Sequence, residues 1–307
     1  MTASKKLRVA TRGSVLALAQ TRQLVEQLRG ANPAVHFEVV TFATTGDRIT
    51  DRPLSQFRGM GVFVKELEAA LLSGSADLAV HSLKDVPIAC AKGLSLATFP
   101  VRNNPFDLCL GRSGRCFADL PPGAVVGTSS PRRLVQLRAQ RPDLVFKDLR
   151  GNVDTRLRKL DAGNYDAIIV AAAGMLRLGK PFDPAALLPP EICLPAAGQG
   201  CLVLECREDD VDALGVAAKV DDAMTRLAVS AERDFLGAIG GGCRTPAAVY
   251  AKNRGQQLTL WAMIGDPDTA KIARDKLTVD SGAGTTAGSA LAGRIVALCK
   301  ETGISLA

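Results

Sequence analysis

The chain is poor in the residue types on which metal and nucleic-acid binding usually depend. Only two histidines occur among its 307 residues, His36 and His81, and none of the eight cysteines forms a CxxC pair. A zinc site of the Cys/His type therefore has few ligands to draw on. Aromatic side chains make up 4% of the residues, which leaves few platforms for stacking bases. We therefore expect no metal and no nucleic acid.

Long hydrophobic runs are also missing. No run approaches the roughly 18 residues of a membrane span, and residues 7–12 lack the apolar core of a secretory signal. We therefore expect a cytoplasmic protein that does not enter a membrane and whose thiols are reduced. With 47% hydrophobic and 22% charged residues, the chain can bury a substantial core, and its length predicts two or three domains.

Positive charge is concentrated in one part of the chain. The whole sequence has a formal net charge of +7, and residues 128–158 alone contain eight basic and three acidic residues, a local net charge of +5. Such a local excess indicates an anionic partner, and the scarcity of aromatic side chains favours an acidic small molecule over a nucleic acid.

The first two thirds of the chain alternate between strand and helix patterns, which is typical of α/β domains with mainly parallel sheets. The predicted strands are residues 7–10, 35–42, 77–81, 124–127, 144–147 and 166–170, and the predicted helices are 14–29, 62–72, 131–140 and 152–162. After Asp221 the pattern changes to a helix at 222–238, strands at 247–251, 258–264 and 271–279, a Gly/Ser/Thr-rich stretch at 281–289 and a helix at 291–300. This indicates a smaller α+β domain.

Residues 79–87, with the sequence AVHSLKDVP, carry the strongest candidate for catalysis. An apolar strand runs directly into His, Ser, Lys and Asp, and Pro87 then stops further pairing. Asp85 is a lone carboxylate followed by Val86 and a proline, a suitable place for an acid that moves protons or stabilises a cation. A solvated loop at a strand end is the alternative that these residues leave open.

Three predicted strand-to-helix junctions share one design. Residues 11–14, 127–133 and 149–156 each offer hydroxyl or backbone N–H groups at a helix N-terminus beside one or two arginines. Helix N-termini attract anions, and arginine adds a planar fork suited to carboxylate or phosphate. Neither GxxxxGK[ST] nor GxGxxG after a strand is present. The separate arginines therefore favour a ligand with several dispersed carboxylates over a nucleotide.

Cys243 is the only cysteine in a glycine-rich turn, residues 240–246. The three glycines clear space around its sulfur, and Arg244 favours the thiolate. A covalent role and a small apolar filler are both compatible with this pattern.

Taken in order, residues 80–87, 127–133, 149–156, 194–200 (LPAAGQG) and 241–243 resemble the porphobilinogen deaminase (hydroxymethylbilane synthase) family over nearly the whole chain. The resemblance implies two α/β domains like those of periplasmic binding proteins with a cleft between them, and a smaller C-terminal α+β domain. It implies domain 1 at 1–100, with a return at about 200–220, domain 2 at 101–199 and domain 3 at 221–307.

The implied reaction is the head-to-tail joining of four porphobilinogen units, each losing ammonia, to give hydroxymethylbilane for haem biosynthesis. A dipyrromethane cofactor attached to Cys243 would prime the chain. Asp85 would bind the cofactor by accepting hydrogen bonds from pyrrole N–H groups, stabilise the cationic intermediate and transfer protons. A monomer is the expected state. By resemblance, the residues that hold the cofactor carboxylates are Lys84, Ser130, Arg132 and Arg133, and those that serve substrate and elongation are Arg12, Ser14, Arg150, Arg156, Arg177 and Gln199.

Two positions depart from the family pattern. Met60, in the predicted mobile loop 56–63, stands where a lysine is common, and Ala248 stands where a glycine is common. His81 has no role in this chemistry and is interpreted as structural. Two alternatives from other classes remain: a non-catalytic protein that binds an anionic metabolite, and a nucleic-acid-binding protein.

Overall fold

A computed structural model describes residues 5–44, 64–112, 114–240 and 246–305. The chain divides into two compact units. Unit 1 consists of Met1–Arg102 and Cys201–Arg226, and unit 2 of Asn103–Gly200 and Leu227–Ala307. The predicted domains 101–199 and 221–307 thus fall largely in unit 2. The division into three domains stays a prediction.

Unit 1 contains a five-stranded sheet in the order β2-β1-β3-β10-β4. Its strands are β1 (Lys5–Arg12), β2 (Val35–Phe42), β3 (Leu78–Ser82), β4 (Leu94–Thr98) and β10 (Leu202–Arg207). Strand β1 is parallel to β2 and β3, whereas β10 is antiparallel to β3 and β4. Its helices are α1 (Val15–Ala31), α3 (Lys65–Leu72) and α7 (Val211–Ala218).

The first sheet of unit 2 repeats this pattern in the order β7-β6-β8-β5-β9. Its strands are β5 (Asp107–Gly111), β6 (Val125–Gly127), β7 (Val145–Lys147), β8 (Ala167–Ala171) and β9 (Leu187–Leu188). Strand β6 is parallel to β7 and β8, and β5 is antiparallel to β8 and β9. Strands β5 and β10 are therefore equivalent: each follows a passage of the chain between units and forms the antiparallel fourth strand. Helices α4 (Pro131–Gln140), α5 (Val153–Asp161) and α6 (Ala172–Arg177) accompany this sheet.

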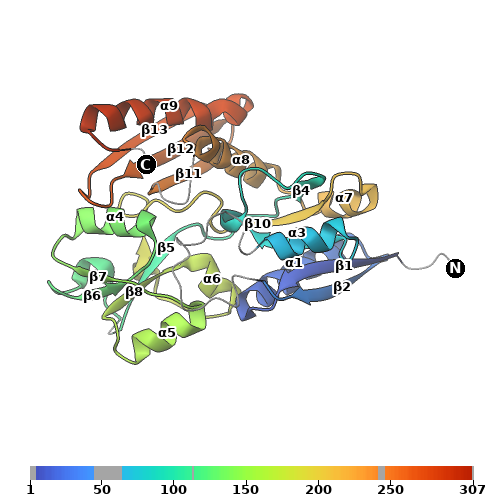
Figure 1. Ribbon diagram of the computed structural model, residues 1–307, viewed down its shortest axis with the longest axis horizontal. Helices are drawn as coiled ribbons and strands as arrows, with labels where there is room; N and C mark the ends of the chain where they lie inside the picture. The colour runs from blue at the N-terminus through green and yellow to red at the C-terminus, as the bar shows by residue number, and fades with distance from the viewer. Residues whose placement is uncertain (1–4, 45–63, 113, 241–245, 306–307) are drawn as a thin grey trace. The chain divides into compact units, whose positions relative to one another are not determined.

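The C-terminal part of unit 2 is a three-stranded antiparallel sheet with a long helix packed on it (Figure 1). The strands are β11 (Ala247–Arg254), β12 (Gln257–Gly265) and β13 (Ile272–Asp280). The helices are α9 (Gly284–Thr302) and α8 (Ala223–Ala238), and the first four residues of α8 belong to unit 1. One core joins Phe235 of α8, Leu260 of β12 and Ile295 of α9, all fully buried. Two α/β sheets and a smaller α+β part confirm the predicted fold class.

Local signals placed the starts of α1, α4, α5 and α8 within one residue, whereas α6 and α7 were not predicted and the start of α9 was predicted wrongly. Residues 284–289 were expected to lead into a helix and instead form its first turns. Their small size explains the difference, because a Cβ on Gly288 would lie 2.2 Å from the carbonyl oxygen of Ala231. Ser289 adds a hydrogen bond from its Oγ to Oδ1 of Asp234, at 2.7 Å. Glycine and serine here allow α9 to lie close against α8.

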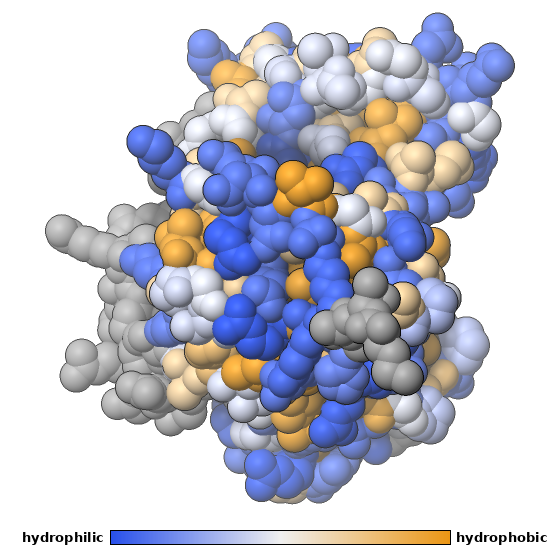
Figure 2. Space-filling view, turned by 90° about the vertical axis from the view of Figure 1, so that its right-hand side faces the viewer, coloured by the Kyte–Doolittle hydropathy of each residue, from blue (hydrophilic) through white to orange (hydrophobic). Residues whose placement is uncertain are grey.

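Hydrophobic side chains on the surface are scattered. On the face drawn in Figure 2 they form small patches among hydrophilic residues, as is normal for globular proteins. Within the described part of the chain, no helix is both long and apolar enough to cross a membrane.

Candidate active site

The carboxyl ends of β1 and β3 form one edge of the unit 1 sheet, because the two strands are parallel. The chain leaves β1 through Arg12 and enters α1 with Ser14 as N-cap, whose Oγ accepts a hydrogen bond from the backbone N–H of Ala17 at 3.3 Å. Nε2 of Gln20 on α1 donates to Oγ of Ser82 at the end of β3, at 3.1 Å. The predicted residues Arg12 and Ser14 therefore lie at the same sheet edge as the 82–87 turn.

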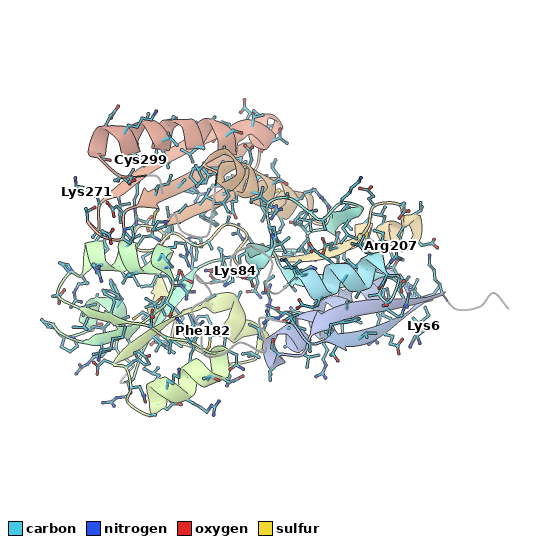
Figure 3. The ribbon with its side chains drawn as sticks, in the orientation of Figure 1. Lys6, Lys84, Phe182, Arg207, Lys271 and Cys299 are labelled. Carbon is cyan, nitrogen blue, oxygen red and sulfur yellow. The ribbon has the colours of Figure 1, made fainter. Side chains whose placement is uncertain are left out.

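Asp85 lies at the end of a short 3-10 turn, Leu83–Asp85, that follows β3 directly. Buried Leu83 anchors this turn, and its backbone N–H donates to the carbonyl of Cys201 at 3.0 Å. Lys84 and Asp85 are exposed, and Lys84 is labelled in Figure 3 at the opposite end of the unit 1 sheet from Lys6. Asp85 has no hydrogen-bond or ion-pair partner among the described residues. The anchored turn fixes the backbone of Asp85, and its carboxylate is available to contact a substrate.

His81 points the other way, into the protein. Its Nε2 lies 3.0 Å from Oε2 of Glu205 on β10, and the two side chains are only 4% and 0% exposed. The structure thus separates the polar groups of the 79–87 motif: the imidazole is interior, whereas Lys84 and Asp85 reach the surface. This placement is consistent with a structural role for His81.

In unit 2 the two remaining arginine junctions are joined by hydrogen bonds. Oγ of Ser129 donates to the carbonyl of Leu149 and accepts from its backbone N–H, both at 3.0 Å. Ser130 is the N-cap of α4, and Asn152 that of α5. Gly151 has φ +109°, and a Cβ there would lie 2.6 Å from the side chain of Thr155. Only glycine therefore allows this turn to approach α5 so closely.

Arg132 and Arg133 lie in the first turn of α4, and both are buried. Nη2 of Arg132 lies 2.8 Å from Oδ2 of Asp107, and Nη2 of Arg133 lies 2.6 Å from Oδ1. Burial alone raises the pKa of Asp107, but the two guanidinium groups outweigh it and hold that pKa well below its usual range. Sequence reasoning missed Asp107. The sequence offered one indication of it: Asp107 directly precedes the apolar run 108–110.

Three further predicted residues contact either Asp107 or a backbone carbonyl of the motifs 149–156 and 194–200. Nε2 of Gln199 donates to Oδ1 of Asp107 at 2.8 Å. Nε of Arg156 donates to the carbonyl of Gly151 at 2.8 Å, and burial with the charge of Arg133 lowers the pKa of Arg156 to about 10. Nη2 of Arg177 donates to the carbonyl of Gly200 at 2.7 Å.

Arg150 takes a different position. Its guanidinium lies 3.9 Å from a carboxylate oxygen of Asp148, and its side chain is partly exposed. Two predictions fall outside the described residues: the attachment residue Cys243, and the loop 56–63 with Met60.

Comparison with known proteins is decisive about the family. The family model "Porphobilinogen deaminase, dipyromethane cofactor binding domain" matches residues 7–214, and "Porphobilinogen deaminase, C-terminal domain" matches residues 226–297. The porphobilinogen deaminase of Brevibacillus brevis is 47% identical over 274 residues, 89% of each chain. That of Sorangium cellulosum is 48% identical over 269 residues, 88% of this chain and 90% of the relative. This chain belongs to the porphobilinogen deaminase family.

A weak likeness to solved structures adds nothing to this assignment. The periplasmic VFT2 domain of Bordetella pertussis BvgS aligns with a TM-score of 0.43 and 17% identity, over 72% of this chain and 88% of that chain.

The residues of unit 2 fit the dipyrromethane cofactor of porphobilinogen deaminases. Nε of Arg133 is buried and has no partner in the described part of the chain, which is costly unless a bound group accepts from it. Two guanidinium groups face a single carboxylate at Asp107, so the cluster retains positive charge. Carboxylate side chains on a bound pyrrole would supply both the acceptor and the countercharge.

Proposed function

We propose that this chain is a hydroxymethylbilane synthase that joins four porphobilinogen units head to tail with loss of ammonia. The observation that carries the proposal is the exposed carboxylate of Asp85, which has no partner among the described residues and lies at the same sheet edge as Arg12 and Ser14. Membership of the porphobilinogen deaminase family supports it.

Asp85 is the proposed catalytic residue. Each addition forms one carbon–carbon bond, breaks the carbon–nitrogen bond of the aminomethyl group and removes one proton from a pyrrole carbon. A carboxylate stabilises the cation that remains when ammonia leaves, and it can accept that proton. Because Asp85 is fixed by buried Leu83 and has no competing partner in the described chain, it can serve both tasks.

The arginines are the proposed carboxylate-binding groups. Each porphobilinogen unit brings two carboxylates, so the growing product is strongly anionic, and arginine forks bind carboxylates through paired hydrogen bonds. We propose that six residues, most of them positively charged, bind the substrate and the growing chain: Arg12, Ser14, Arg150, Arg156, Arg177 and Gln199.

The dipyrromethane cofactor, when bound, supplies the pyrrole carbon from which the product grows. We propose that Cys243 attaches it by a thioether and that its carboxylates are held by Lys84, Ser130, Arg132 and Arg133. The sequence supports the attachment, because three glycines without side chains directly precede Cys243.

Incubation with porphobilinogen tests the function. Cofactor-loaded protein should consume the substrate and yield uroporphyrin after acid cyclisation and oxidation. Asp85→Asn should keep the fold and the adduct but reduce kcat by about 10²–10⁴-fold, whereas Cys243→Ser should lack the adduct in an intact-mass spectrum. Binding without consumption would instead identify a metabolite-binding protein, and wild-type rates in Asp85→Asn would refute the role of that carboxylate.

We further propose that the protein acts in the cytoplasm as a monomer, without nucleic acid or membrane. Membership of the porphobilinogen deaminase family supports these statements. Size-exclusion chromatography with light scattering tests the monomer, and a steep salt-dependent affinity for oligonucleotides would contradict the statement on nucleic acid.

A further inference from the structure

Asp107 is the most completely buried acid in contact with the predicted cofactor-binding residues, and the reaction described above does not use it. We propose that Asp107 is a positioning residue that orients the guanidinium groups of Arg132 and Arg133 to receive the cofactor carboxylates. This inference rests on the proposed function and adds a residue to it.

The guanidinium groups of Arg132 and Arg133 share one carboxylate, and each also donates through Nη1 to a backbone carbonyl, that of Leu194 and that of Ile169 respectively. Arg132 and Arg133 are consecutive residues of α4, and consecutive side chains on a helix leave it about 100° apart. Their guanidinium groups would therefore diverge and, as like charges, repel each other. Each instead donates to a different oxygen of Asp107, at 2.8 Å and 2.6 Å. One carboxylate thus draws both forks to one place.

Asp107 itself is held rigidly. As the first residue of β5 it pairs with Ala171 of β8 and Leu188 of β9, and its side chain is fully buried. Gln199 donates through Nε2 both to Oδ1 of Asp107 and to the carbonyl of Pro105, at 2.8 Å and 2.7 Å. A carboxylate fixed by two neighbouring strands and a side-chain amide can transmit a defined position to the arginines it binds.

The cluster is arranged to remain positive. Asp107 cancels only one of the two guanidinium charges, and Nε of Arg133 keeps an unused donor among the described residues. Nearby Arg156, whose pKa is lowered by burial and by Arg133, adds a further cation. Asp107 therefore holds the arginines together without neutralising them, and the remaining charge is available to an anionic ligand.

Asp77 provides a matched control in unit 1. It also accepts from a guanidinium at 2.8 Å, from Arg8, with Arg207 at 3.6 Å, and its pKa is likewise lowered. It precedes β3, however, whereas Lys84 and Asp85 follow that strand, and Arg207 lies away from Lys84 in Figure 3. Asp77 thus forms a similar ion pair outside the proposed cofactor-binding set.

The experiment measures covalent loading of cofactor-free protein as porphobilinogen is added, by intact mass, in wild type, Asp107→Asn, Asp107→Glu and Asp77→Asn. Circular dichroism first establishes the folded fraction. Asp107→Glu keeps the charge and moves it, so it remains informative if Asp107→Asn fails to fold. We expect both Asp107 variants, per folded chain, to load at least about tenfold more slowly than wild type, since small misplacements of binding groups cost rate steeply, and Asp77→Asn to load normally.

A second readout separates positioning from loss of stability. Per loaded chain, the Asp107 variants should show a reduced kcat with a KM for porphobilinogen within about twofold of wild type, because the residues assigned to substrate are unchanged. Normal loading and normal kcat in a folded Asp107 variant would overturn the positioning role alone. A wild type that never loads would overturn the proposed function and this role with it.

Discussion

The two five-stranded sheets place a buried carboxylate on equivalent strands and treat it in opposite ways. Asp107 on β5 contacts Arg132, Arg133 and Gln199. Glu205 on β10 contacts His81 through Oε2, while its buried Oε1 has no hydrogen-bond partner in the described chain. The same sheet pattern therefore supports a charged cluster in unit 2 and a sparsely bonded acid–imidazole pair in unit 1.

The difference matches the residues proposed for each unit: the paired arginines lie in unit 2, and Asp85 lies in unit 1. Unit 2 keeps the guanidinium groups of Arg132 and Arg133 buried. The carboxylate of Asp107, which accepts hydrogen bonds on both oxygens, compensates part of their charge. Unit 1 carries Asp85, the proposed catalytic residue, and the buried acid of its sheet, Glu205, contacts an imidazole instead of a guanidinium.

The largest expected effect is on stability when Asp107 loses its charge. Asp107→Asn leaves two buried guanidinium groups without a countercharge and should lower the free energy of unfolding by about 3–5 kcal/mol. Urea unfolding followed by circular dichroism measures the change. Asp77→Asn, where Arg8 is 38% exposed, should lose less. An equal loss in the two variants would remove the special status of Asp107.

The next effect is on acid stability. Since the pKa of Asp107 is lower in the folded chain than in the unfolded chain, its stabilisation is complete above the usual aspartate pKa of about 4 and is lost as the pH falls below it, by up to about 1.4 kcal/mol per pH unit. Urea unfolding at pH 5, 4 and 3 should therefore show a steeper decline in wild type than in Asp107→Asn. Parallel declines would contradict the assigned shift.

A smaller effect is expected at the equivalent acid of unit 1. Glu205→Gln keeps a hydrogen-bonding group beside His81 and replaces a carboxyl group whose Oε1 has no partner in the described chain, so stability should change by no more than about 1 kcal/mol. The measurement is the same urea titration at pH 7. A loss comparable to that of Asp107→Asn would mean that Glu205 also compensates a fixed cation, and the contrast between the units would fail.

The smallest stability effect is expected at Arg156, whose pKa in the folded chain is lowered to about 10. Its charged form costs stability at every pH below that value, and the cost fades as the pH rises toward the usual arginine pKa. Arg156→Gln should therefore leave the Tm of cofactor-free protein at pH 7 equal or higher, while porphobilinogen turnover falls. Exposed Arg158 on the same helix is the control: Arg158→Gln should alter neither. A lower Tm in Arg156→Gln would contradict the prediction.

Local features of the fold were predictable because their causes are local. Ser14 and Ser130 were identified as helix starts by a polar side chain placed before a helical pattern, and the predicted helix 152–162 begins at Asn152. Each of the three side chains accepts a hydrogen bond from the following turn. Strand β2 and helix α4 have the predicted bounds. The early residues of α9 were missed because their helical state depends on close packing against α8, which no local signal records.

The candidate site was predictable only in part for a similar reason. Asp85, the arginines and Gln199 stand in motifs that can be read along the chain, whereas Asp107 is 25, 26 and 92 residues away from the three side chains that bind it. Its apolar surroundings in sequence gave no indication of a partner. A buried charge must find its countercharge in space, and that choice depends on strand pairing and helix placement.

Short segments were enough to predict the family, the helix starts at Ser14 and Ser130, the lone acid at the end of β3 and the surplus of arginine at helix starts, because each of these features depends on neighbouring residues only. The tertiary structure decided which of the charges are engaged. Burial forces Arg132 and Arg133 onto Asp107 and seals His81 with Glu205, since an unpaired charge in the interior is costly. Asp85 is exposed and has no charged partner in the described chain. The proposed chemistry depends on this carboxylate being unengaged.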